Sequence, residues 1–356
     1  MIKSIGYAAK NQFSSLHSFE FERRDPNPDD VVIDVLFCGV CHSDVHQVKN
    51  EWANTVYPCL PGHEIVGRVF SVGEKVTRYR HGDMVGVGCM VDSCGVCESC
   101  QEGLENYCSG KHGWTATYNG PMKPDGTNTY GGYSNYIVVK EHFVLSIPDA
   151  LEPAAAAPIL CAGVTTYSPL KHWKVSPGQK VGVVGLGGLG HMAVKLAVAM
   201  GAYVTVFTTH KEKEDDAFAL GASGVIIESD KAAMASQERS FDFILDTIPQ
   251  KHDVNPFILC LKRDATLCLV GPLEPLAPIN NQQVAMGRRC VAGSVIGGIS
   301  ETQEVLNFCA EHSIAPNIEI IGIGGVNDAF KRIEKEDVRF RFVIDMQTLK
   351  AEAATN

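Results

Sequence analysis

The sequence of 356 residues predicts an α/β protein with two parts, one rich in β-strands and one in which strands and helices alternate around a parallel sheet. The first 150 residues contain short, β-branched runs that are separated by turns. The pattern changes near residue 153, and a glycine-rich turn then lies between a strand-like and a helix-like segment. A typical domain size of roughly 150 residues also indicates two domains for this length.

In the first part, the strand-like runs are short and bounded by turn residues, as in an antiparallel barrel or sandwich. They lie at 31–37, 65–72, 84–87 and 136–139.

In the second part, an alanine-rich helix begins at Pro153, and a turn at 176–178 precedes a regular alternation of strands and helices. We expect strands at 180–184, 203–207, 225–227, 241–246 and 266–271, and helices up to residue 200 and at 215–220. This alternation is typical of a parallel sheet.

The glycine-rich turn has the pattern G-x-G-x-x-G and consists of Gly185, Leu186, Gly187, Gly188, Leu189 and Gly190. Alone the motif is weak, because such turns also serve close packing. Here a strand precedes it, a helix follows it, and a second strand ends about 20 residues later. The glycines would let the backbone approach a pyrophosphate, which the helix N-terminus attracts. The context therefore favours dinucleotide binding.

Four closely spaced cysteines can complete a tetrahedral metal site by themselves: Cys94, Cys97, Cys100 and Cys108. An iron–sulfur centre is the first alternative, because its bacterial motif also begins C-x2-C-x2-C. That motif needs a fourth cysteine after three residues, followed by proline. Here the gap is seven residues and Ser109 follows, so zinc is favoured. Four thiolates leave no open position, which predicts a structural zinc.

A second metal site of different composition is predicted from Cys41, His63 and Cys161. Two thiolates and one imidazole leave the fourth tetrahedral position open, as in catalytic zinc sites. Taken singly, each residue would be interpreted as part of the core. Their occurrence together with the four-cysteine loop and the nucleotide motif favours the metal interpretation.

The composition restricts the partners and the compartment. A formal net charge of −10 argues against nucleic acid or an anionic membrane as a partner. No signal peptide and no run of about 20 apolar residues is present, so we expect a cytoplasmic protein. The other seven cysteines are scattered singly, which favours reduced thiols: residues 38, 59, 89, 260, 268, 290 and 309.

Five segments together resemble the zinc-dependent medium-chain alcohol dehydrogenases, and within them the cinnamyl alcohol dehydrogenase group. They are 39–46, 61–67, the four-cysteine loop, 160–167 and 185–191. The resemblance runs in order from about residue 5 to residue 346. It implies a GroES-like β-rich catalytic domain formed by 1–153 and 297–356, with the structural zinc loop at 94–108. It also implies a Rossmann domain with a doubly wound parallel sheet at 154–296 that binds the nicotinamide cofactor.

The resemblance also implies roles around a catalytic zinc bound by Cys41, His63 and Cys161, so that each subunit holds two Zn²⁺ ions. Glu64 is the acidic residue that can approach the metal. Asp44 would accept the spare imidazole N–H of His63 and fix its tautomer. Proton transfer would pass through a hydroxyl and a histidine, here Ser43 and His46. Many relatives have threonine where Ser43 stands.

The end of the second Rossmann strand predicts NADP(H) rather than NAD(H). An acid there would hydrogen-bond the adenosine ribose and repel a 2′-phosphate. This chain has no such acid and instead offers hydroxyls and amines: Thr208, Thr209, Lys211 and Lys213. The alternative is an ordinary solvated helix start. Further cofactor contacts implied by the resemblance are Thr165, Val270, Ser294 and Arg341.

The expected reaction is hydride transfer between NADP(H) and primary alcohols or aldehydes. Trp52 and Trp114 could line an aromatic slot for cinnamyl or benzyl substrates, although each can equally be a core residue. The sequence leaves open aromatic or aliphatic substrates and a biosynthetic or detoxifying role. Two rival functions are an NAD-dependent polyol or secondary-alcohol dehydrogenase and a non-catalytic NADPH-binding relative. A homodimer is expected through an edge strand at 289–295.

Overall fold

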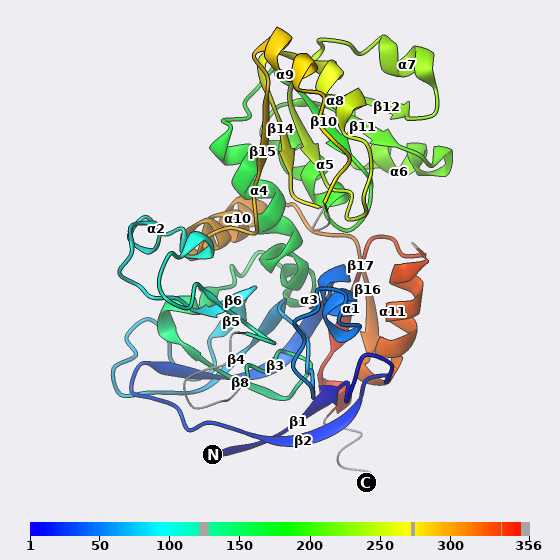
Figure 1. The fold of residues 1–356 in the computed structure, drawn as a ribbon. Coiled ribbons are helices and arrows are strands. Elements are labelled where there is room, and N and C mark those ends of the chain that lie inside the picture. The colour runs from blue at the N-terminus through cyan, green and yellow to red at the C-terminus, as the bar shows by residue number, and fades with distance from the viewer. Residues whose placement is uncertain (121–127, 272–274, 336, 350–356) are drawn as a thin grey trace. The chain divides into compact units, whose positions relative to one another are not determined.

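The chain forms two compact units in the computed structural model, which describes residues 1–120, 128–271, 275–335 and 337–349. The first unit consists of Met1–Cys161 and Gly298–Asn356, and the second of Ala162–Gly297. In Figure 1 the blue and the orange to red ends of the chain belong to the first unit, and the green and yellow middle belongs to the second.

A seven-stranded sheet forms the centre of the first unit in the described part of the chain. Its order is β16-β17-β3-β4-β5-β9, with β8 also paired to β3. All neighbours are antiparallel except β16 and β17. The strands are β3 (Asp30–Val40), β4 (Ile65–Val72), β5 (Met84–Val87), β8 (Tyr136–Lys140), β9 (Leu145–Ser146), β16 (Ile318–Gly322) and β17 (Arg341–Asp345).

Strand β3 is the central strand of this sheet, and most of its residues are buried. It pairs with β17, which comes from the far end of the chain, with Val343 opposite Gly39. Figure 1 shows these two segments, one blue and one red, side by side. The two ends of the chain are therefore joined in one sheet. The predicted strands at 65–72 and 84–87 are confirmed with the same bounds, whereas β16 and β17 were not predicted.

Two hairpins and several short helices complete the first unit. The hairpins pair β1 (Ile2–Ala8) with β2 (His17–Arg23) and β6 (Met90–Asp92) with β7 (Thr115–Ala116). The α-helices are α1 (His42–Val48), α2 (Glu98–Gln101), α3 (Pro153–Ala156), α10 (Ile299–Glu311) and α11 (Val326–Glu334). The 3-10 helices are η1 (Glu105–Tyr107), η2 (Glu141–Phe143), η3 (Ala157–Leu160) and η5 (Ile323–Gly325).

The second unit contains a parallel sheet of six strands among its described residues, in the order β12-β11-β10-β13-β14-β15. The strands are β10 (Lys180–Val184), β11 (Tyr203–Thr208), β12 (Gly224–Ile227), β13 (Phe241–Asp246), β14 (Leu261–Leu269) and β15 (Cys290–Gly293). The strand order reverses between β10 and β13, the position at which doubly wound sheets bind their ligands. The strands predicted at 180–184 and 241–246 are confirmed.

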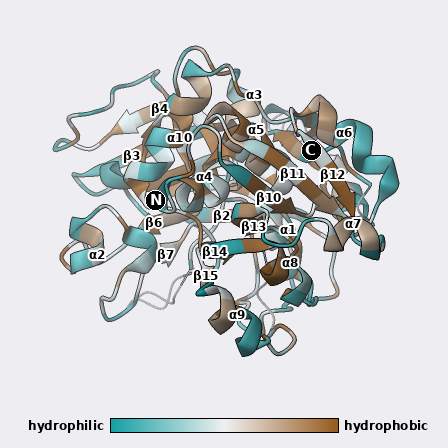
Figure 2. Cartoon of the chain, turned by 90° about the horizontal axis from the view of Figure 1, so that it is seen from above, coloured by the Kyte–Doolittle hydropathy of each residue, from teal (hydrophilic) through white to brown (hydrophobic). Residues whose placement is uncertain are grey.

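Short helices alternate with these strands: α4 (Ala162–His172), α5 (Gly190–Ala199), η4 (Lys211–Lys213), α6 (Glu214–Ala219), α7 (Lys231–Ala235), α8 (Asn255–Cys260) and α9 (Asn281–Gly287). Figure 2 shows β10 and β11 largely in the hydrophobic colour, whereas α6 carries both colours. The core of this unit includes Phe207, Phe241 and Phe257, and the ring of Phe207 contacts Phe241 at a tilt and Phe257 edge to face. None of the helices in the described ranges combines the length and apolar character that a membrane span requires.

Candidate functional site

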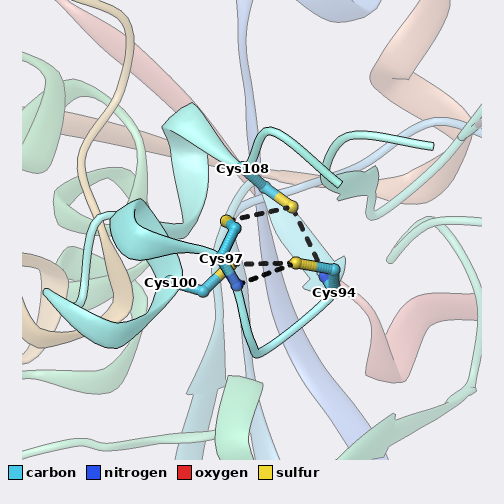
Figure 3. A group of neighbouring side chains, drawn as sticks. All are labelled: Cys94, Cys97, Cys100 and Cys108. Atoms are coloured by element: carbon cyan, nitrogen blue, oxygen red, sulfur yellow. Dashed lines mark hydrogen bonds between the residues drawn. The ribbon is translucent and has the colours of Figure 1, made fainter. Parts of the chain in front are cut away.

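The four loop cysteines converge at a single point in the first unit (Figure 3). The sulfurs of Cys94 and Cys100 are 3.9 Å apart, and those of Cys97 and Cys108 are 4.0 Å apart. A zinc ion with Zn–S bonds of about 2.3 Å holds its sulfurs about 3.8 Å apart in a tetrahedron. The geometry and the four soft donors therefore fit a structural zinc.

Backbone hydrogen bonds prepare this loop for a metal. The backbone N–H groups of Cys97 and Cys94 donate to the sulfurs of Cys94 and Cys108, both at 3.4 Å. Backbone hydrogen bonds from Cys100 and Ser109 lower the pKa of Cys97 to about 5. The thiolate, which is the form that binds metal, is thus present at neutral pH.

The loop is also attached to the start of α10 through the buried Glu105. One carboxylate oxygen accepts the backbone N–H of Ile299 at 2.9 Å, and the other contacts His142 Nε2 at 2.6 Å. Burial raises the pKa of Glu105, but these hydrogen bonds outweigh burial and lower it. A further bond joins Ser300 Oγ to the carbonyl of Gly103 at 3.3 Å. Cysteine loop and helix therefore form one structural element.

The second metal site joins three segments that lie far apart in the sequence. Cys41 precedes α1, His63 precedes β4, and Cys161 follows η3; all three are buried. The two sulfurs are 4.0 Å apart, and His63 Nε2 lies 3.3 Å from Cys161 Sγ. These separations fit a tetrahedral zinc with two thiolates and one imidazole.

The two thiols of this site have opposite acidities. The hydrogen bond from Cys161 lowers the pKa of Cys41 well below its usual value, with help from the positive charges of Arg341 and His63. The same hydrogen bond raises the pKa of Cys161 well above its usual value. A cation that binds both sulfurs would displace the proton that the pair otherwise shares.

Glu64 belongs to this cluster, because its carboxylate lies within 4.8 Å of the other three ligand atoms. It forms an ion pair with Arg341, and both residues are buried. Arg341 Nη1 also lies 3.8 Å from Cys41 Sγ. A buried carboxylate needs such a partner, because the desolvation of an unpaired charge is costly. Arg341, expected at the cofactor pyrophosphate, thus contacts the metal site itself in this structure.

Asp44 holds His63 in the orientation that a metal ligand requires. Its Oδ1 lies 3.1 Å from His63 Nδ1, and its Oδ2 accepts the backbone N–H of Cys41 at 2.9 Å. Burial lowers the pKa of His63, but the Asp44 carboxylate raises it to well above its usual value. Nε2 is the ring nitrogen that faces the Cys161 sulfur, and an N–H on Nδ1 that donates to Asp44 would leave Nε2 free to bind a metal.

The proposed relay residues lie on α1, directly after Cys41. Ser43 is half-buried, with Oγ 3.6 Å from Cys41 Sγ. His46 lies one turn further, pairs with Glu51 and stacks on His42 with ring centroids 4.7 Å apart. The ring of Trp52 lies beside that of His46, with ring centroids 5.7 Å apart.

Trp114 is half-buried just before β7, and its role in a substrate pocket stays a prediction.

In the second unit, the glycine turn connects β10 to α5 as the motif predicts. Gly185 has φ +86°, which favours glycine, and a Cβ at Gly190 would collide with the carbonyl oxygen of Gly185. Leu186 is buried, whereas nothing lies within 4 Å of a Cβ placed on Gly187. The backbone is therefore open to a ligand at Gly187 and closely packed at Gly190. Gly188 and Leu189 complete the turn.

Most of the other predicted cofactor residues lie at or just after the ends of strands in this unit. Thr208 is the last residue of β11, and its Oγ1 accepts the backbone N–H of His210 at 3.1 Å. Thr209 and Lys211 are exposed, and Lys213 is half-buried. Val270 and Ser294 follow β14 and β15, while Thr165 is buried in α4. Val270 and Ser294 thus share the strand-end edge of the sheet with the glycine turn.

Two features of the site were missed by sequence reasoning. Tyr133 is fully buried and donates a hydrogen bond from its hydroxyl to Asp44 at 3.2 Å. Asp246, at the end of β13, is paired with His252 Nε2 at 2.8 Å. For Tyr133 the available signal was its position after two glycines. For Asp246 it was an acid that ends a buried strand.

Family models match both halves of the chain. The alcohol dehydrogenase GroES-like domain matches residues 27–149, and the zinc-binding dehydrogenase domain matches residues 188–311. The aldehyde reductase YahK of Escherichia coli is 54% identical over 98% of this chain and 99% of its own length. The NADP-dependent alcohol dehydrogenase C 1 of Mycolicibacterium smegmatis is 50% identical over 97% of this chain and 98% of its own.

Two solved structures of cinnamyl alcohol dehydrogenases are similar to this chain over nearly its whole length. A cinnamyl alcohol dehydrogenase from Sorghum bicolor is 43% identical, with a TM-score of 0.93 over 97% of this chain and 98% of its own. A cinnamyl alcohol dehydrogenase from Helicobacter pylori, solved in complex with NADP(H), is 40% identical, with a TM-score of 0.90 over 97% and 99% of the two chains.

Proposed function

Because the chain belongs to the zinc-dependent medium-chain alcohol dehydrogenases, we propose that it is an NADP(H)-dependent alcohol dehydrogenase and aldehyde reductase. Its substrates would be primary alcohols and aldehydes over a broad range, including cinnamyl and benzyl compounds. The observation that carries this proposal is the buried group of Cys41, His63 and Cys161 beside Glu64. Three ligands of this type leave one metal position for substrate.

Each residue of the site has a role in this proposal. Cys41, His63 and Cys161 would hold the catalytic zinc, which, when bound, makes an alcohol more acidic and polarises an aldehyde. Asp44 orients His63 through Nδ1. Glu64 would approach the metal when the fourth ligand leaves, and Arg341 balances its charge meanwhile.

Ser43 and His46 would carry the proton between the reacting oxygen and solvent. Both side chains are half-buried on α1, the helix that follows Cys41, and Ser43 Oγ lies close to the Cys41 sulfur. The His46 side chain contacts Glu51 and is 26% exposed, so water can reach its imidazole.

The cofactor would bind the second unit at the glycine turn. Residues Gly185 to Gly190 would contact the pyrophosphate, and Thr208, Thr209, Lys211 and Lys213 the 2′-phosphate of NADP. The absence of an acid at the end of β11 supports this preference. Thr165, Val270 and Ser294 would contact the nicotinamide, and Arg341 could exchange Glu64 for the pyrophosphate when the cofactor binds.

At the level of the whole protein, we propose that 1–153 and 297–356 act as the catalytic domain and 154–296 as the cofactor domain. The division of the chain into two compact units supports this assignment. The four loop cysteines would hold the structural zinc. We also propose a cytoplasmic homodimer that takes small-molecule substrates, with Trp52 and Trp114 in its substrate pocket.

The test is the oxidation of NADPH and NADH with cinnamaldehyde, followed by nicotinamide absorbance, in the native protein and in Cys161→Ala. Cys260→Ala is the matched control, because Cys260 is also buried but belongs to the second unit and to neither group of metal ligands. We expect turnover with NADPH that falls to background in Cys161→Ala alone. Activity with NADH alone would contradict the cofactor assignment. No activity with either cofactor on aromatic or aliphatic aldehydes would favour a non-catalytic relative.

A further inference from the structure

Donors from the ligand segments and from two tyrosine hydroxyls, those of Tyr133 and Tyr118, surround the Asp44 carboxylate. Oδ1 faces His63 Nδ1 at 3.1 Å and the backbone N–H of Gly62 at 3.2 Å. Oδ2 accepts the backbone N–H of Cys41 at 2.9 Å and the hydroxyl of Tyr133 at 3.2 Å. A carboxylate has about four acceptor positions. The Tyr133 hydroxyl therefore occupies one of the positions of Asp44 that the ligand segments leave open.

Tyr133 is built to remain a donor to Asp44. Its side chain is fully buried, and burial raises the pKa of its hydroxyl well above the usual value. Its ring covers Gly62, where an added Cβ would come within 2.7 Å of Tyr133 Cδ1. Gly62 has φ +105°, so this position already requires glycine. The ring and the residue before His63 thus fit against each other.

The backbone around Tyr133 also supports the His63 segment. The N–H groups of Gly131, Gly132 and Tyr133 donate to the carbonyls of Leu60, Gly62 and Pro61, at 2.9, 2.9 and 3.0 Å. These three bonds run along the residues that immediately precede His63. The segment 131–133 is therefore a brace for that loop.

Arg23, from β2, fixes the other side of this brace. Its guanidinium donates to the carbonyls of Tyr130 and Gly131, both at 2.9 Å, and to Ser134 Oγ at 2.7 Å. Three hydrogen bonds from one side chain hold the brace against the β1–β2 hairpin. Tyr133 therefore cannot move away from Asp44 without breaking an anchored segment.

We propose that Tyr133 is a positioning residue for the candidate catalytic metal: through Asp44 it restricts the rotation of the His63 imidazole and retains the metal. The inference rests on the proposed function, because it assumes that Cys41, His63 and Cys161 bind zinc. Hydrogen bonds to charged acceptors are stronger than neutral ones, and partners of metal-ligating histidines tune metal affinity. Tyr133 contacts neither metal nor substrate and acts through Asp44.

The experiment compares Tyr133→Phe with Tyr79→Phe, a matched loss of one buried hydroxyl in the same unit. Tyr79 Oη donates to the carbonyl of Val144 at 2.6 Å and accepts from Arg78 Nη2 at 3.1 Å, so the control removes at least as many hydrogen bonds as Tyr133→Phe. Zinc release to a chromophoric chelator separates the two metal sites, and visible absorption of the cobalt-substituted catalytic site reports ligand geometry. We expect Tyr133→Phe to release the catalytic zinc about ten-fold faster and to change the cobalt spectrum. Tyr79→Phe should do neither.

A double variant tests the route of the effect. If Tyr133 acts through Asp44, adding Tyr133→Phe to Asp44→Asn should leave zinc release nearly unchanged, because the carboxylate that it positions is already lost. Native release rates and an unchanged cobalt spectrum in Tyr133→Phe would overturn the inference, as would full additivity in the double variant. If the phenylalanine variant does not fold, 3-fluorotyrosine at position 133 replaces it. Its more acidic hydroxyl should slow zinc release, and an unchanged rate would overturn the inference.

The failure of the proposed function would be recognised separately. In that case the native protein itself would bind about one zinc per chain, in the four-cysteine loop, and the comparison of variants would have no catalytic zinc to measure. A native protein with two zinc ions and dehydrogenase activity, together with an inert Tyr133→Phe, would reject the role of Tyr133 alone.

Discussion

Arg341 shows how one residue can serve a site in more than one way. Its guanidinium is buried against Glu64 and Cys41, where it balances two negative groups. The family resemblance assigned it to the cofactor pyrophosphate, and its environment shows why an arginine is suited to both. A planar guanidinium can pair with a carboxylate or a phosphate and stays charged when buried. Removal of this side chain would leave Glu64 as an uncompensated buried charge.

A single residue, Thr208, should decide the cofactor preference. In Thr208→Asp we expect the ratio of kcat/KM for NADPH to that for NADH to fall by about 100-fold, because a carboxylate repels the 2′-phosphate and accepts hydrogen bonds from the NADH ribose. Steady-state kinetics with both cofactors measure the ratio. Thr208→Val is the control, because it removes the hydroxyl without adding charge. An unchanged ratio in the aspartate variant would contradict the assignment of the phosphate site.

The pair of His252 and Asp246 predicts a pH-dependent contribution to stability in the second unit. The hydrogen bond to Asp246 raises the pKa of His252, so the folded state favours the protonated imidazole. A group whose folded pKa is raised stabilises fully below its unfolded pKa, and this stabilisation is lost as the pH rises through the folded pKa. His252→Gln should therefore lower the free energy of unfolding by about 1 kcal/mol near about pH 6 and by less near about pH 9.

Denaturant unfolding at both pH values measures this difference for His252. His17→Gln, which changes an exposed histidine of β2, is the control and should show the same small effect at both. A His252→Gln effect that is constant with pH would show that the imidazole is not charged in the folded protein.

At the scale of elements, the cysteine loop is stabilised from two sides. Four sulfurs point toward one centre, while Glu105 and Gly103 bind the beginning of α10. In Figure 1 the α2 segment and α10 lie next to each other, in agreement with these bonds. The loop has little hydrophobic core, since Cys94 and Val96 are exposed. A metal therefore replaces the stabilisation that apolar packing supplies elsewhere.

Loss of one loop cysteine should destabilise the first unit. For Cys97→Ser we expect zinc content to fall from about two ions per chain to about one, and the Tm to fall by roughly 10 °C. Elemental analysis and thermal unfolding measure the two quantities. Cys290→Ser, at an exposed cysteine of β15, should change neither. Retention of both zinc ions by Cys97→Ser would rule out the four-thiolate site.

At the scale of the whole molecule, the parallel sheet ends at β15, which pairs with β14 on one side. An unpaired edge is open to strand addition from a second copy. The N–H of Ser294 points to Leu269 of β14 at 3.1 Å. Because backbone groups alternate along a strand, the N–H of Val291 faces away from β14, toward the open edge.

Val291→Pro should therefore weaken the proposed homodimer while keeping the pairing of β15 with β14. Proline has no backbone N–H, so a partner strand would lose the hydrogen bond that Val291 donates across the edge. We expect light scattering to give twice the chain mass for the native protein, and a shift toward the chain mass for Val291→Pro. Val291→Thr, which keeps the N–H, should remain dimeric. A native protein of single chain mass, or a proline variant as dimeric as the native protein, would rule out pairing through this edge.

Local patterns determined much of this protein. Cysteine spacing, the G-x-G-x-x-G turn between a strand and a helix, and β-branched runs all act over a few residues, where backbone geometry and ligand chemistry leave few alternatives. For this reason β4, β5, β10 and β13 were predicted with their bounds. The types of Cys41, His63 and Cys161, together with the family resemblance, also predicted that these three residues share one metal site.

Only the tertiary structure decided which distant groups touch. The pairing of β17 with β3, the contact of Arg341 with Glu64 and the hydrogen bond from Tyr133 to Asp44 join residues that are 89 to about 300 positions apart. No periodicity encodes such contacts, because they depend on how whole elements pack. The sequence by itself thus determined the chemistry of the sites, whereas the fold decided which buried charges and hydroxyls complete them.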